Sequence, residues 1–216
     1  MSCGDQVREC DSALHPEAPG LNNSRNAALP FIARQNSCND LAGVLMIMAA
    51  TSHSIRPIEP ADQPVLWDIL YEALWDPPTA PRRPRMVLSN PLIAAYVENW
   101  GAHTTDLGFL ALVGDTVAGG IMSRLLVPPQ QGGAFFDEQT PQVGIAVFPQ
   151  FQNRRIGTSL FRAYLDAASV RFPRVSLGVH PQNHVAIQLY QSFGFAQFAI
   201  GGGGYLNMVK TFNQNA

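Results

Sequence analysis

The chain has 216 residues, of which 46% are hydrophobic and 14% are charged, a balance that is typical of one globular domain with its own core plus a shorter extension. The formal net charge of −2 is nearly neutral, which argues against a surface built to bind nucleic acid. The longest apolar run, residues 41–50, is too short to cross a bilayer and follows a polar stretch unlike a secretory signal, so we expect no membrane segment.

Residues 1–50 differ in composition from the rest of the chain. They are rich in Asn, Ser, Ala and Pro without sustained periodicity, which predicts a disordered extension, or a misassigned start with translation beginning at Met46 or Met48. This segment contains all the cysteines of the chain: Cys3, Cys10 and Cys38. Because residues 51–216 contain no thiol, we expect no disulfide or cysteine-ligated metal there, and a reducing cytoplasm as the location.

Regular periodicity begins just after this extension. Residues 53–58 alternate in polarity and predict a first strand. In residues 61–75 the apolar side chains recur at helical spacing, with Asp62 as the expected N-cap. After a proline-rich loop, residues 91–100 predict a second helix that stops at Gly101. A strand followed by helices therefore opens the domain.

The middle of the chain predicts a hairpin and a central strand. Residues 107–126 contain two apolar strands joined at Gly114 and Asp115, although this pair stands in the reverse of the usual turn order. Residues 141–148 are apolar almost throughout, which favours a strand buried on both faces.

The stretch "VFPQFQNRRIGTSLF", residues 147–161, predicts a strand end, a polar turn and the start of a helix. The first N–H groups of a helix lack internal partners and the helix dipole adds partial positive charge, so Arg154 and Arg155 would complete a phosphate site there. From this stretch alone, a turn with solvated arginines is equally consistent.

The last part of the chain predicts a strand, a capped helix and a closing hairpin. Residues 174–180 form the strand, and residues 183–195 form a helix that begins after Asn183 and ends at Gly194. Two closing strands flank four glycines: residues 195–200 and 205–210 around residues 201–204.

Two stretches, "VFPQFQNRRIGTSLF" and "LGVHPQNHVAIQLYQSFGF", resemble the acetyl-CoA-binding half of the GNAT superfamily of N-acetyltransferases in order and spacing. Residues 152–157 occupy the pyrophosphate motif, with Arg155 in place of its first glycine. The resemblance spans residues 53–210 and is most specific in 141–195. It implies an α/β fold, α+β in some classifications, with a mixed, centrally splayed sheet of about six to seven strands and about four helices. Residues 51–216 would then form a single GNAT domain.

The resemblance also implies acetyl-CoA as co-substrate and a set of site residues. Asn183 would face the pantetheine arm, Tyr190 would donate a proton to the departing sulfur, and a backbone N–H near Val147 would face the acetyl carbonyl. Arg155 either blocks close approach of the pyrophosphate or turns outward and adds charge, and we favour the second. The expected cofactor-binding residues are Ile145, Ala146, Val147, Gln152, Asn153, Arg154, Arg155, Ile156, Gly157, Thr158, Asn183 and Tyr190.

The general base is left open by the sequence. Relatives often carry Glu on the fourth strand where this chain has Gln142, and an amide cannot take up a proton. Asp137 and Glu138 are candidates acting through water, and of the two Glu138 is carried forward as a catalytic candidate. Two acids in a loop are also consistent with simple solvation.

Other polar clusters predict less. His180 and His184 are separated by a proline and a helix cap, so we expect no zinc site and assign no metal. The arginines of residues 81–85 are expected in a solvated turn between the first two helices, a segment that in this fold commonly borders the acceptor site.

Three functions remain open at this stage. The leading prediction is an N-acetyltransferase that moves acetyl from acetyl-CoA directly to a primary amine of a small molecule, peptide or protein, without a covalent cysteine intermediate. The alternatives are a non-catalytic acyl-CoA-binding module and a nucleotide-binding α/β protein, the last disfavoured by the absence of the glycine fingerprint. We expect no nucleic-acid or membrane partner, and the family leaves a homodimer open.

Overall fold

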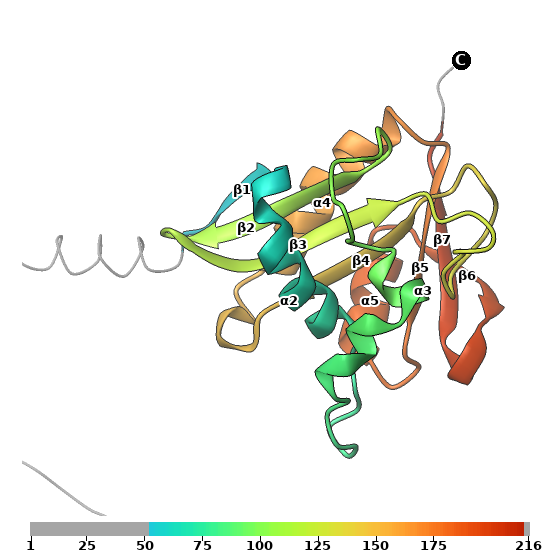
Figure 1. Cartoon of the computed structure of the whole chain (residues 1–216), viewed down its shortest axis with the longest axis horizontal. Helices are drawn as coiled ribbons and strands as arrows, with labels where there is room; N and C mark the ends of the chain where they lie inside the picture. Colours follow the sequence, from blue (N-terminus) through green and yellow to red (C-terminus); the bar gives the residue numbers. More distant parts are fainter. Residues whose placement is uncertain (1–51, 214–216) are drawn as a thin grey trace, which may run out of the picture. The chain divides into compact units, whose positions relative to one another are not determined.

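The computed structural model describes residues 52–213, whose course is shown in Figure 1. All of them belong to the unit Leu41–Ala216. The predicted extension over residues 1–50, with its three cysteines, lies outside the described residues.

Seven strands form one mixed sheet in the order β1-β2-β3-β4-β5-β7-β6, as predicted for this fold. Neighbouring strands are antiparallel except for the central pair β4 and β5, which is parallel. Gly114, with φ of 59°, makes the predicted turn between the second and third strands. The bounds are β1 Ser54–Pro57, β2 Leu107–Val113, β3 Thr116–Arg124, β4 Gln142–Val147, β5 Arg174–Val179, β6 Ala196–Ile200 and β7 Leu206–Thr211.

The described residues form four α-helices: α2 Gln63–Ala73, α3 Pro91–Ala94, α4 Ile156–Ser169 and α5 His184–Ser192. Asp62 occupies the N-cap position of α2 as expected, but its side chain makes no capping hydrogen bond to the helix. Its carboxylate instead pairs with Arg56 at 2.7 Å and accepts a hydrogen bond from the N–H of Glu59. The same carboxylate cannot also turn toward the N–H groups of α2, so the ion pair replaces the cap.

The second helix is shorter than the sequence predicts. Regular α-helix ends at Ala94, and the chain continues through turns to Gly101. The carbonyls of Ala95 and Glu98 accept hydrogen bonds from the Arg124 guanidinium at 2.8 and 2.7 Å. The Arg124 side chain, distant in sequence, therefore donates to carbonyls that would accept hydrogen bonds from N–H groups of the next turn if the helix continued.

Hydrophobic cores cover both faces of the sheet, since successive residues of a strand point to opposite sides. On β3, Ile121 belongs to the core under α4 and α5, whereas Met122 belongs to the core under α2. Figure 1 shows α2 crossing in front of the strands and α4 behind them. The sheet is therefore buried on both sides by helices, as in other α/β folds.

The sheet separates in its centre. The register between β4 and β5 contains one pair, Gln142 and Ser176, near the start of both strands. Beyond this pair the strands part, and the edge of β4 over residues 145–147 has no partner on the β5 side. The predicted splay is thus present, and it opens the site described next.

Candidate active site

A groove of about 960 Å³ opens where β4 and β5 part. One side, here called the α4–α5 wall, consists of the end of β4, the turn before α4 and part of α5. All the residues predicted to bind the cofactor line this wall, with the exception of Arg154. The other side, here called the α2–β5 wall, is lined by Glu72, Trp75, Asp76, Arg82, Gly178, His180 and Tyr205 among others.

The N-terminus of α4 has no side-chain cap and opens on the groove. Arg155, the residue before the helix, has φ of 59°, and Asn153 has φ of 61°, so the turn bends through the left-handed region twice. The first helical residues are Ile156, Gly157 and Thr158, and no described group accepts a hydrogen bond from their N–H groups. Free N–H groups at the positive end of a helix dipole are suited to bind phosphate.

The two arginines of the turn lie in different places. Arg155 lines the groove, whereas the Arg154 guanidinium lies over the Phe151 ring, 5.6 Å from its centroid, and Arg154 does not line the groove. Both are exposed. Of the two cations predicted for the phosphate site, the structure therefore brings Arg155 to it.

Tyr190 reaches the groove from α5. Only 8% of its surface is exposed, because its ring packs against Phe161 and Phe195 at centroid distances of 5.3 and 6.1 Å. Burial raises the pKa of its phenol above the ordinary value near 10 that the sequence alone suggests. The hydroxyl consequently stays protonated throughout the neutral range and can donate a hydrogen bond into the groove.

Asn183 caps α5 and also lines the groove. Its Oδ1 accepts a hydrogen bond from the N–H of Ala186 at 3.2 Å, as expected for a capping residue. Its side-chain NH₂ has no hydrogen-bond partner among the described residues and remains a donor for a ligand.

The candidates for general base lie away from the groove. The carboxylate of Asp137 pairs with Arg174 at 2.6 Å and accepts a hydrogen bond from Thr140. Burial alone would raise the pKa of Asp137, but the hydrogen bonds from Thr140, the N–H of Gln139 and Arg174 together lower it. Glu138 is not among the residues that line the groove.

Gln142 also lies outside the groove, at the start of β4. It is fully buried, and its Oε1 accepts hydrogen bonds from the Tyr96 hydroxyl at 3.0 Å and the N–H of Ala134 at 3.1 Å. Gln142 therefore joins β4 to the segments around residues 96 and 134, a structural role that requires no proton transfer.

The α2–β5 wall contains groups that the sequence reasoning missed. Glu72 and Asp76 are the carboxylates that line the groove within the described part of the chain. Glu72 pairs with Arg82 at 3.1 Å, and Asp76 pairs with Arg83 at 2.6 Å. The hydrogen bond from Arg83 holds the pKa of Asp76 below its usual range. Two of the arginines predicted to lie in a solvated turn, Arg82 and Arg83, thus pair with the carboxylates of this wall. Glu72 is the more exposed of the two carboxylates, with 25% of its side chain exposed against 12% for Asp76.

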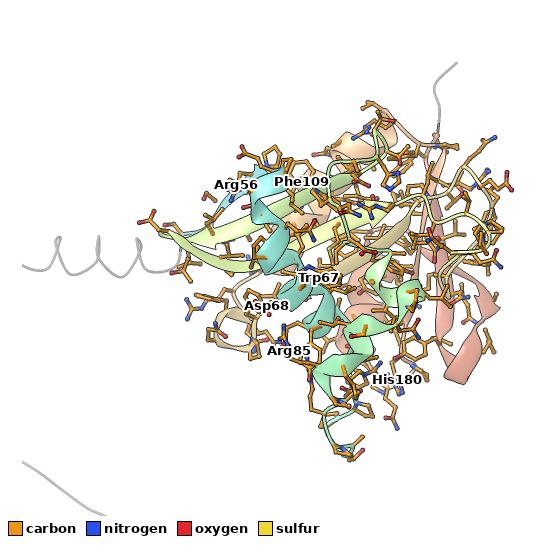
Figure 2. The ribbon with its side chains drawn as sticks, viewed as in Figure 1. Arg56, Trp67, Asp68, Arg85, Phe109 and His180 are labelled. Atoms are coloured by element: carbon orange, nitrogen blue, oxygen red, sulfur yellow. The ribbon has the colours of Figure 1, made fainter. Side chains whose placement is uncertain are left out.

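His180 follows β5 directly and lies at the same end of the domain as Arg85 in Figure 2. Its Nδ1 accepts a hydrogen bond from the N–H of Gln182 at 3.2 Å, which places the proton of the neutral ring on Nε2. In this tautomer the ring offers a donor to the groove rather than a base.

The described residues show neither a metal-binding group nor a membrane-spanning helix. They contain no group of three or more His, Cys, Asp or Glu side chains that could hold a metal ion. Nor do residues 52–213 contain a helix with the length and apolarity needed to cross a membrane.

Comparison with known proteins identifies what this arrangement resembles. The family model described as "Acetyltransferase (GNAT) family" matches residues 67–195. No curated protein matches the chain. Solved structures with the same fold are 16–19% identical to this chain, a likeness that shows the fold alone.

The acetyltransferase of the GNAT family from Streptococcus pneumoniae is 16% identical, with a TM-score of 0.55 over 75% of this chain and 100% of that one. The Salmonella typhimurium protein yncA, solved with its cofactor acetyl-CoA, is 19% identical, with a TM-score of 0.54 over 76% and 96%. The ribosomal-protein-alanine N-acetyltransferase from Brucella melitensis is 18% identical, with a TM-score of 0.54 over 74% and 99%. All three share the fold of this chain at these TM-scores.

Proposed function

This chain belongs to the GNAT family of acetyltransferases, and from that premise we propose that it transfers the acetyl group of acetyl-CoA directly to a primary amine within a ternary complex. The observation that carries the proposal is the uncapped N-terminus of α4, which opens on the same groove as Tyr190. A phosphate site and a buried proton donor at opposite parts of one groove are what a bound thioester cofactor requires.

The α4–α5 wall would hold acetyl-CoA by three sets of groups. The N–H groups of Ile156, Gly157 and Thr158, with the Arg155 guanidinium, would bind the pyrophosphate. The NH₂ group of Asn183 would donate to the pantetheine arm. The unpaired edge of β4 near residue 147 would donate a backbone N–H to the acetyl oxygen, where negative charge develops during attack.

Acyl transfer then needs three proton movements. The acceptor ammonium must lose a proton before its nitrogen can attack the thioester carbon, and we assign this step to Glu72, directly or through one water. As the C–N bond forms and the C–S bond breaks, the nitrogen loses its second proton to solvent and the sulfur leaves as a thiolate. Tyr190 hydrogen-bonds that thiolate and supplies its proton, giving an amide and CoA. The Tyr190 phenolate then takes a proton from solvent and Glu72 releases its proton to solvent, which restores both groups.

The raised pKa of Tyr190 affects the last step. A phenol whose pKa lies above that of an ordinary thiol, about 8.5, transfers its proton uphill but remains a good hydrogen-bond donor to a thiolate. Stabilisation of the developing charge on sulfur is therefore the larger part of its proposed role, and proton delivery completes as product leaves.

The proposal is tested by two measurements on the purified full chain. Calorimetric titration should detect acetyl-CoA binding, with no comparable binding of NAD or ATP. Release of CoA thiol should then accelerate when primary amines are added. Binding without amine-dependent release of CoA would instead identify the non-catalytic acyl-CoA module, and preferential binding of NAD or ATP would identify the nucleotide-binding alternative.

A further inference from the structure

Three rings meet on the α2–β5 wall of the groove. Trp75 follows α2, His180 follows β5 and Tyr205 precedes β7, and all three are half-buried. The Trp75 and His180 rings are 5.0 Å apart between centroids, and the His180 and Tyr205 rings are 5.4 Å apart at 87°. These three residues, here called the ring cluster, present the exposed parts of their rings to the groove.

The charges of this wall are already matched within the protein. Glu72 has Arg82 at 3.1 Å, and Asp76 has Arg83 at 2.6 Å. Arg82 is further held over the Tyr71 ring, 4.5 Å from its centroid. A polyamine or an aminoglycoside carries several positive charges, and to bind here it would have to displace these arginines from their carboxylates. Among the described residues, the α2–β5 wall therefore offers no unpaired carboxylate that would attract a polycationic acceptor.

Gly178 of β5 is exposed and lines the groove with the ring cluster. A Cβ at this position would lie 3.5 Å from Oδ1 of Asn207 and 3.9 Å from Cδ1 of Tyr205, both ordinary contact distances. Exposed ring surface is a recognition surface for flat apolar groups, and an ammonium group near it is also attracted by the ring faces.

Building on the proposed function, we infer that the acceptor is a primary amine attached to a flat aromatic body, which packs on the ring cluster of Trp75, His180 and Tyr205. The matched charges of the wall favour such a monocation over polycationic amines. They also surround the amine with little net negative charge, and a partly desolvated amine in such a site loses its proton more easily than in water.

The test uses the full chain in three steps. Acetyl-CoA binding is first measured by calorimetry, because its absence would refute the proposed function itself and this inference with it. CoA release is then compared for 2-phenylethylamine and tryptamine, for n-propylamine as an amine without a ring, and for spermidine and kanamycin as polycations. We expect kcat/KM to be highest for the two aromatic amines.

Variants separate the ring cluster from general effects on folding. Tyr205→Leu and Trp75→Leu remove one ring each, and Phe136→Leu makes the same change at an exposed ring that does not line the groove. The first two should lower kcat/KM for 2-phenylethylamine by about 3- to 10-fold more than they lower kcat/KM for n-propylamine, the effect of losing one aromatic contact. Phe136→Leu should change neither.

Other outcomes overturn the inference while leaving cofactor binding intact. Preference for spermidine or kanamycin would show that the wall recognises charge. Equal rates for 2-phenylethylamine and n-propylamine would show that the ring cluster does not select the acceptor. Turnover of no amine in the panel by a protein that binds acetyl-CoA would refute the proposed transferase activity, and this inference with it. A Tyr205→Leu variant that fails to fold is replaced by Tyr205→Ile, judged by the same comparison.

Discussion

Arg155 occupies a backbone conformation that favours glycine, with φ of 59° at the residue before α4. The sequence presents this arginine as a departure from the family motif at the first glycine position, and the structure explains why the family uses glycine there. A non-glycine residue in the left-handed region costs roughly 1–2 kcal/mol, so the chain retains a strained residue at the mouth of the groove. A strained residue of this kind is expected to persist where its side chain has a function.

Arg155→Ala is therefore expected to weaken acetyl-CoA binding by about 1.5–3 kcal/mol, the range for a hydrogen bond to a charged group, and to reduce its dependence on salt. Arg154→Ala is the matched control, because the Arg154 guanidinium lies over Phe151 and away from the groove. It should change binding by less than about 0.5 kcal/mol. Calorimetry at low and high salt measures both, and equal losses would contradict the assignment.

Arg155→Gly separates the side chain from the strain. It should bind acetyl-CoA as weakly as the alanine variant does, yet melt at a higher temperature than the wild type because glycine relieves the left-handed residue. A glycine variant that binds as tightly as the wild type would show that the guanidinium is not used.

Tyr190→Phe keeps the packing against Phe161 and removes only the hydroxyl. We expect acetyl-CoA affinity to change little, and the rate of acetyl transfer to fall by roughly 10²–10⁴-fold if chemistry limits turnover. Because burial raises the pKa of Tyr190, its hydroxyl stays protonated to higher pH than a free phenol does. As the pH is raised, deprotonation of this residue should therefore cause no loss of wild-type activity up to about pH 10. Normal turnover by the Phe variant at saturating substrate would assign thiolate protonation to water.

Glu72→Gln tests the proposed base. The amide keeps the size of the side chain but cannot take a proton, so kcat/KM should fall by about 10²-fold at neutral pH, with a smaller deficit at high pH where more of the amine is already neutral. Glu138→Gln is the control for the candidate suggested by the sequence, and it should be close to wild type because Glu138 does not line the groove. The reverse result would restore Glu138 as the base.

At the scale of elements, one buried ion pair determines how the segment after α3 is held. The side chains of Arg124 on β3 and Asp106 are 5% and 3% exposed and lie 2.7 Å apart. The same guanidinium donates to the carbonyls of Ala95 and Glu98. This one side chain therefore connects β3 to two separate parts of the chain.

Arg124→Met should lower the free energy of unfolding by about 3–5 kcal/mol, because it leaves the Asp106 carboxylate buried without its partner. Arg85→Met removes an exposed pair, with Asp68, whose side chains are 56% and 51% exposed, and should cost less than about 1 kcal/mol. Urea unfolding of both variants makes the comparison. Similar small changes in the two would mean that solvent reaches Asp106 or that the segment rearranges.

The parts of the site differ in how far apart in the sequence their residues lie. The turn before α4 and the cap of α5 depend on residues within a few positions of one another, such as Asn183 and Ala186. The α2–β5 wall depends on ends of elements far apart in the chain, including Trp75, His180 and Tyr205. The first kind of feature was predicted correctly from the sequence, and the second was not predicted.

At the scale of the whole molecule, the two hydrophobic cores within residues 52–213 already extend from Ile55 to Phe212. We therefore expect a chain that begins at Thr51 to fold and to bind acetyl-CoA as the full chain does. Thermal melting and calorimetric titration of both forms provide the comparison. Loss of a cooperative transition in the shorter chain would show that residues 1–50 contribute to the fold.

Most of the fold follows from the sequence because period and turn chemistry are local properties. The alternation of apolar residues defined the strands, and the helical spacing after Arg155 defined α4. The error at α3 has a different origin. Residues 91–100 have a helical pattern, but the Arg124 guanidinium donates hydrogen bonds to two of their carbonyls. Because Arg124 is distant in sequence, no local stretch of sequence could predict these hydrogen bonds.

The sequence by itself determined the local structure of the α4–α5 wall, since the turn over residues 152–157, the start of α4 and the capped helix that carries Tyr190 follow from local patterns. Only the tertiary structure decided that Arg155 and not Arg154 lines the groove, and that Glu72 and not Glu138 lines it. It also decided that the ring cluster lies on the α2–β5 wall, opposite the α4–α5 wall. The physical reason is that a splayed sheet brings the ends of α2, β5 and β7 together across the gap between β4 and β5. Packing of non-local residues, rather than any local pattern, determines which side chains meet there.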